Sequence, residues 1–166
     1  MAKDDDYSQF VAARWNRLVR TAVLLGCTRE SAEDLVQEAL VKCYVHWSKV
    51  DAADDRDAYV HRLLVNTHRT RLRRRWTGEQ ATADLPDVRL ADPTEEFDVA
   101  HTVLAALDRL TREHRAVVVL RHYAGLDETQ TAAVLGVPRG TVKSRHSRAV
   151  ARLAADPTLV ALKETQ

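Results

Sequence analysis

Basic side chains with the spacing needed to read a DNA groove occur near the end of the chain. Residues 139–155 contain five arginines or lysines and no carboxylate. Long donors on a helix can hydrogen-bond to guanine or phosphate, and short side chains between them let the backbone approach the major groove. We therefore predict contacts to duplex DNA, unless the stretch is only a solvated basic helix. The predicted residues are Arg139, Thr141, Lys143, Ser144, Arg145, Ser147, Arg148 and Arg152.

A second basic stretch, residues 58–76, interleaves six arginines with aromatic, amide and hydroxyl side chains and has no acidic residue. Unstacked bases need flat surfaces, groups that read base edges, and cations that neutralise phosphates. We expect this stretch to bind single-stranded DNA, although a basic stretch taken alone can equally be a solvated charge run. The predicted residues are Tyr59, Arg62, Asn66, Thr67, Arg69, Arg73 and Arg74.

A different kind of surface is predicted on a helix that runs to about Trp47. One side of this helix is apolar and must face a core. The opposite side mixes acidic, amide and β-branched residues, which suits a protein partner with a basic rim, although two exposed valines are also ordinary. The residues of this acidic and apolar stripe are Asp34, Gln37, Glu38, Val41 and Val45, and the first four are the predicted interface.

No constellation suited to catalysis accompanies these surfaces. The seven histidines are scattered, Cys27 and Cys43 fit no metal spacing, and neither basic stretch holds a carboxylate cluster or a nucleophile beside a base. We expect no enzyme activity, no metal and no cofactor. The chain has no leader-like start and no apolar run near the ~20 residues that span a bilayer, which predicts a cytoplasmic protein without a membrane partner.

The elements that must position these residues are helices. Few glycines and prolines and abundant Ala, Leu, Arg and Glu favour an all-α fold. We expect two small helical domains, residues 1–77 and 95–166, joined by a flexible linker at 78–94. The segment 79–98 holds seven carboxylates against one arginine. The predicted helices are 7–26, about 28–47, 57–76 with a break near Asn66, 96–110, 112–124, 128–135 and 138–154.

The last two helices have the signals of a helix-turn-helix. Ala132 allows close packing, Gly136 relieves the backbone at the turn, and Pro138 starts the second helix. Helical projection places Val142 on the inner face of that second helix. His146 falls on the same face, and we expect it to be a packed core histidine.

Three stretches together resemble a family, the extracytoplasmic-function (ECF) sigma factors of the sigma-70 superfamily. They are residues 32–40, residues 62–67 continuing into 72–75, and residues 140–145 with 147–149. The resemblance implies that the helix matching residues 34–47 docks on core RNA polymerase. It also implies that residues 59–75 open and read the minus-ten promoter element, with Asn66 in a loop that reads a flipped base. The helix matching residues 139–153 would then read the minus-thirty-five element.

Two departures from the family pattern stand out. In the family, the segment before the residues that read the minus-ten element is richer in aromatic residues, whereas residues 57–61 of this chain have only Tyr59. His146 stands where the family has an apolar residue. Because we expect no further regulatory domain after the helix-turn-helix, control would come from a separate anti-sigma protein, from expression or from proteolysis. The alternative is a stand-alone helix-turn-helix repressor or activator whose N-terminal domain dimerises or senses a signal. Such a protein would bind duplex DNA tightly without polymerase and would not need the stripe.

Overall fold

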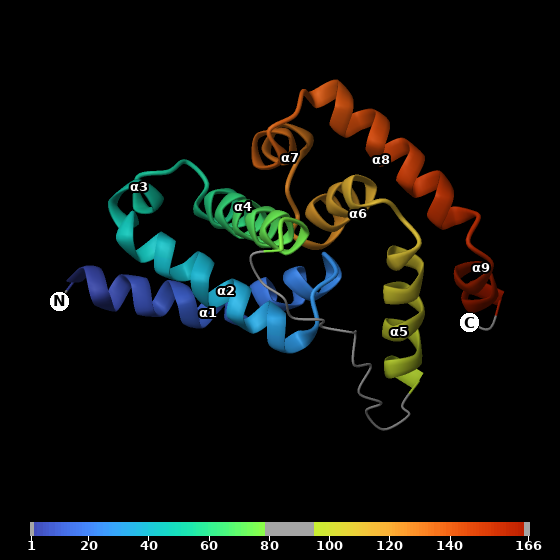
Figure 1. Cartoon of the computed structure of the whole chain (residues 1–166), viewed down its shortest axis with the longest axis horizontal. Coiled ribbons are helices and arrows are strands. Elements are labelled where there is room, and N and C mark those ends of the chain that lie inside the picture. Colours follow the sequence, from blue (N-terminus) through green and yellow to red (C-terminus); the bar gives the residue numbers. More distant parts are fainter. Residues whose placement is uncertain (1, 79–94, 165–166) are drawn as a thin grey trace.

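The computed structural model describes residues 2–78 and 95–164, and every regular element in this part is a helix (Figure 1). The all-α prediction is therefore confirmed. All of the predicted linker except Gly78 lies outside the described residues, and so do its four carboxylates. Among the described residues, no helix combines the length and hydrophobicity of a membrane-spanning segment.

The N-terminal half consists of four helices around one core. They are α1 (Ala2–Leu24), α2 (Arg29–Val45), α3 (Trp47–Asp51) and α4 (Arg56–Trp76). Helix α2 packs between α1 and α4, and the buried cluster contains Phe10, Leu35 and Leu64. Side chains cap the helices: the Thr28 hydroxyl accepts from the Ser31 N–H, and the Asp55 carboxylate accepts from the Ala58 N–H.

Two boundaries in this half differ from the sequence prediction. Helix α4 is continuous, so the predicted break near Asn66 is wrong. The helix predicted to reach Trp47 ends at Val45, and a short helix begins at Trp47. The Trp47 side chain is buried and makes edge contacts with the rings of Tyr7 and Phe10, with centroids 5.3 Å and 5.1 Å away.

The C-terminal half carries the predicted helix-turn-helix. Its elements are α5 (Glu95–Asp108), α6 (Arg112–Val118), the π-helix η1 (Val119–Tyr123), α7 (Glu128–Leu135), α8 (Arg139–Ala154) and α9 (Pro157–Glu164). Asp127 and Gln130 form a reciprocal capping box at the start of α7. Gly136 closes α7 with φ +66°, a left-handed conformation that glycine adopts at least cost.

Helix α9 was not predicted. The sequence stops a helix before Pro157 as expected, but a new helix starts there. The Asp156 carboxylate accepts from the Thr158 N–H at 3.0 Å and receives two hydrogen bonds from Arg109 at 2.8 Å and 2.9 Å. These bonds tie the start of α9 to the segment after α5.

The two halves pack directly against each other, an arrangement the sequence does not reveal. Helix α4 lies beside α7 and contacts it (Figure 1). Helix α1 contacts η1. Val65 of α4 lies in the same buried cluster as Leu120 and Leu135 of the C-terminal half. Polar contacts cross the same junction: Arg17 donates to the carbonyl of Ala124 at 3.0 Å, and Arg69 donates to that of Leu135 at 2.9 Å.

Candidate nucleic-acid and protein interfaces

Helix α8 separates an apolar inner face from a basic outer face. Val142 and Ala149 are fully buried, as the sequence predicts. The predicted duplex contacts Arg139, Lys143, Ser144, Ser147, Arg148 and Arg152 are exposed, and Thr141 and Arg145 are half-buried. Arg139 forms an ion pair with Glu128 of α7 at 3.3 Å. The exposed face offers four cations and two hydroxyls to a ligand.

His146 is not the packed core residue that the sequence suggested. Its ring is half-buried and stacks on the ring of His122 from η1, with centroids 5.0 Å apart and Nε2 atoms 2.7 Å apart. This distance is that of a hydrogen bond, in which one nitrogen carries the proton. Burial lowers the pKa of His146, and the neighbouring His122 and Arg121 lower it further. The partner lies 24 residues away in the sequence, so periodicity alone could not find it.

Helix α4 presents most of the residues predicted to bind single-stranded DNA. Arg62, Asn66, Arg69, Arg73 and Arg74 are exposed, and Tyr59 is half-buried. The Arg62 guanidinium lies over the Tyr59 ring, 5.5 Å from its centroid. Asn66 is exposed but sits within a regular helix rather than in the loop that the resemblance implied.

Thr67 stands apart from this set because it faces the interior. It is 1% exposed, its hydroxyl donates to the Leu63 carbonyl at 2.7 Å, and it accepts from Lys42 Nζ at 3.0 Å. In this conformation the Thr67 side chain cannot contact a base. Arg69 is also occupied, since it binds the C-terminal half through Leu135.

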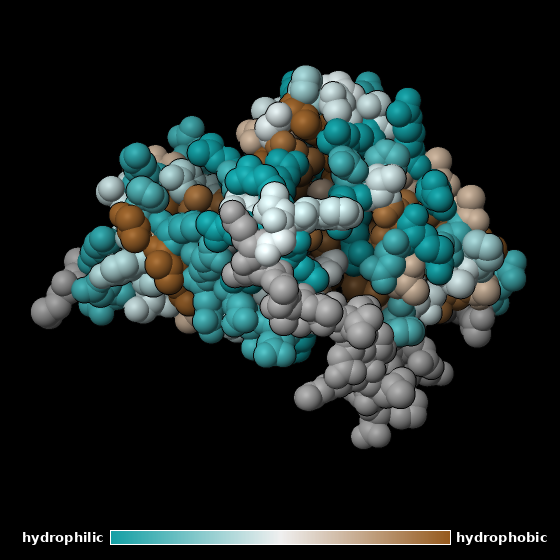
Figure 2. Space-filling model, in the orientation of Figure 1, coloured by the Kyte–Doolittle hydropathy of each residue, from teal (hydrophilic) through white to brown (hydrophobic). Residues whose placement is uncertain are grey.

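The acidic and apolar stripe on α2 is displayed as predicted. Asp34 and Gln37 are exposed, and Val41 and Val45 are 61% and 66% exposed. Tyr44, which is not among the predicted interface residues, is 40% exposed beside them. Tyr44 follows Val41 by three residues, and this spacing predicts that both side chains lie on the same face of the helix. Figure 2 shows a mostly hydrophilic face with a hydrophobic strip over the N-terminal helices.

Glu38 has a second role within the fold. Its carboxylate accepts hydrogen bonds from Lys42 Nζ at 3.1 Å and from Arg71 Nε at 2.9 Å. Burial alone would raise the pKa of Glu38, but these two hydrogen bonds outweigh it, so the pKa is lowered. Glu38 therefore ties α2 to α4 as well as lying on the stripe.

The described residues hold no group of three or more histidine, cysteine or acidic side chains arranged to bind a metal ion. Cys43 is buried, and burial raises its pKa to about 12, so it is an unreactive thiol. Cys27 is half-buried, with Sγ 3.6 Å from His68 Nδ1.

Comparisons with known proteins agree with this architecture. The family models described as "Sigma-70 region 2" and "Sigma-70, region 4" match residues 10–77 and 106–155. An RNA polymerase sigma-E factor of Streptomyces antibioticus is 39% identical over 150 residues, covering 89% of this chain and 82% of the relative. The ECF RNA polymerase sigma factor SigM of Mycobacterium tuberculosis is 39% identical over 151 residues, covering 89% and 75%.

Solved structures show the same fold. The sigma factor RpoE of Bartonella quintana, in complex with the anti-sigma factor NepR, matches with a TM-score of 0.73 at 27% identity, covering 89% of this chain and 94% of that one. CnrH, in complex with the cytosolic domain of CnrY, matches with a TM-score of 0.69 at 26% identity, covering 92% and 87%. With both family regions in place and curated relatives aligned over most of their length, the chain belongs to the ECF sigma factors of the sigma-70 family.

Proposed function

We propose that this chain directs core RNA polymerase to specific promoters for transcription initiation, and that it acts in the cytoplasm without catalytic residues of its own. The observation that carries the proposal is the display of three chemically distinct surfaces on three helices. Helix α2 presents acidic and apolar side chains, α4 presents arginines beside Tyr59, and α8 presents a basic face. A repressor that binds only duplex DNA has no use for the first two.

The domain roles follow from this arrangement. Residues 1–77 would bind core polymerase through Asp34, Gln37, Glu38 and Val41 and would read the minus-ten element through α4. Residues 95–166 would read the minus-thirty-five element through α8, with 78–94 as the linker. Within α4, the exposed arginines support this role best, whereas Thr67 would have to leave its buried position.

A protein inhibitor is a further partner that we propose for this chain. Two proteins that share the fold of this chain were solved with a bound protein. RpoE was solved with the anti-sigma factor NepR, and CnrH with the cytosolic domain of CnrY. The stripe on α2 and the basic faces of α4 and α8 are exposed and therefore open to a protein that blocks them.

Charge reversal on α2 tests the polymerase surface. Asp34 is the better position, because Asp34 is exposed with no hydrogen bond or ion pair to other described residues, whereas reversing Glu38 would also leave Lys42 and Arg71 without their shared partner. Asp34→Arg should abolish run-off transcription with added core polymerase while leaving the circular dichroism spectrum unchanged. The matched control is Asp5→Arg, an exposed aspartate on α1. Equal activity of the two variants would reject the assignment of the stripe.

A further inference from the structure

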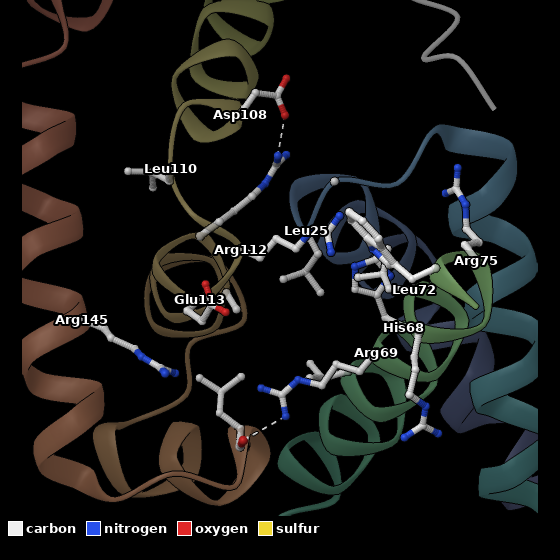
Figure 3. Close-up of a pocket in the computed structure, with 17 residues that line it drawn as sticks. Leu25, His68, Arg69, Leu72, Arg75, Asp108, Leu110, Arg112, Glu113 and Arg145 are labelled. Atoms are coloured by element: carbon white, nitrogen blue, oxygen red, sulfur yellow. Dashed lines mark hydrogen bonds and ion pairs between the residues drawn. The ribbon is translucent and has the colours of Figure 1, made fainter. Parts of the chain in front are cut away.

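A cavity of about 660 Å³ lies where the two halves of the chain meet. One wall is α4, with His68, Arg69 and Leu72, and the other comes from the C-terminal half, with Leu110, Arg112 and Arg145 (Figure 3). This volume lies within the range of sites for small ligands, roughly 300–1,000 Å³. Because both halves supply walls, the cavity exists in this form only while they are packed together.

Positive charge dominates the lining. Six arginines border the cavity against two carboxylates, Asp108 and Glu113. Asp108 is already paired with Arg115. The guanidinium groups of Arg73, Arg75 and Arg145 have no hydrogen-bond or ion-pair partner among the described residues. Unpaired guanidinium groups on the walls of one cavity favour the binding of a multiply charged anion.

The pKa of His68 is affected by the same positive charges. Burial, the largest cause, and the surrounding arginines, Arg112 first among them, together lower the pKa of His68 to about 4. The ring is therefore neutral near pH 7 and can donate or accept one hydrogen bond without adding charge.

An aromatic surface stands at the edge of this basic cavity. Trp76, the last residue of α4, lines it and is 77% exposed. The Arg112 guanidinium of α6 lies 5.8 Å from the centre of the Trp76 ring. An exposed indole beside cations suits a base attached to phosphates, because the base can stack while the cations bind the phosphates.

We propose that this cavity binds a free nucleotide carrying two or more phosphates, with the base on Trp76 and the phosphates held by arginines from both halves. An acidic peptide would use the arginines but would gain little from the exposed indole, so the pairing of the two features favours a nucleotide. A ligand that bridges both halves stabilises the packed arrangement. If the proposed function holds, the nucleotide also competes with promoter DNA for Arg73 and Arg145.

The experiment is isothermal titration calorimetry on the full chain without polymerase, so its outcome is independent of the proposed function. GTP is the probe, with guanosine and inorganic tripolyphosphate as partial ligands. We expect GTP to bind at one site more tightly than either partial ligand. Trp76→Ala should weaken GTP binding about five-fold or more, Trp76→Phe should restore it, and Arg112→Ala should weaken it about ten-fold.

The matched control is Arg20→Ala, an exposed arginine on α1 outside the cavity, which should leave GTP binding unchanged. Tripolyphosphate binding as tightly as GTP, or indifference of GTP to Trp76→Ala, would reduce the site to a charged surface and reject the proposal. Binding of a short single-stranded oligonucleotide that depends on Trp76 and that GTP does not displace would assign the cavity to promoter DNA instead.

Discussion

Val65 offers a direct test of the packing between the two halves. It belongs to α4 in the N-terminal half, yet it is 3% exposed and buried in the cluster of the C-terminal half with Val117, Leu120 and Leu135. Val65→Ala removes two methyl groups, worth about 0.8 kcal/mol each, and leaves a small cavity, for a total of about 2 kcal/mol. The equilibrium should shift about 30-fold toward separated halves.

Small-angle X-ray scattering over a urea series would detect the separation as an increase in radius of gyration, and circular dichroism would follow unfolding of the helices. Val65→Ala should move the expansion to lower urea and leave the helical transition of the N-terminal half in place. The control is Val60→Ala on the same helix, since Val60 is 1% exposed and lies in the N-terminal core. It should lower the helical transition without an earlier expansion. If the two variants behaved alike, the two halves would not pack as described.

Three further predictions concern single residues. Arg148→Ala should weaken duplex binding by about 1–3 kcal/mol in a fluorescence anisotropy assay and leave polymerase binding intact, whereas Arg20→Ala should change neither. The folded-state pKa of His68 is about 4, well below its unfolded value of about 6.5, so the stability it contributes is complete above about pH 6.5 and is lost as the pH falls toward 4. Melting temperatures at pH 7 and pH 5 should therefore differ less for His68→Gln than for the unchanged chain, and an equal difference would contradict this. Gly136→Ala should destabilise the chain by about 1 kcal/mol in urea denaturation, because φ is +66°, although no atom beyond its immediate chain neighbours lies within 4 Å of the added Cβ. Gly140→Ala should instead stabilise the chain, because Gly140 lies in the helical backbone of α8 and the space around the added Cβ is equally open.

Local signals were sufficient for the helix-turn-helix. The predicted helix 128–135 has the observed bounds, and the next begins one residue later than expected, because Asp127, Gly136 and Pro138 determine both ends through nearby atoms. The inward position of Thr67 could also have been predicted. Its spacing of three from Leu64 and seven from Val60 places it on the buried side of α4, although its hydroxyl taken alone suggests a contact to a base.

Helical periodicity in the sequence could not predict features that depend on contacts between residues far apart in the chain. Asp156 starts α9 with the help of Arg109, 47 residues earlier. The sequence predicts Arg69 as a DNA ligand, yet its guanidinium donates to the carbonyl of a residue 66 positions later. The pairing of His146 with His122 and the cavity beside Trp76 likewise arise only when separate helices meet. In each case a polar or aromatic side chain has a role that its own helix does not reveal.

The division of labour between α2 and α8 is tested most directly by size-exclusion chromatography with core RNA polymerase. The unchanged chain and Arg148→Ala should both co-elute with the polymerase in stoichiometric amounts, and Asp34→Arg should elute alone. Run-off transcription should then be lost in Asp34→Arg, which does not bind the polymerase, and weakened in Arg148→Ala, which binds promoter DNA less tightly. If the unchanged chain did not co-elute and instead bound duplex DNA tightly without polymerase, the promoter-directing role would be contradicted.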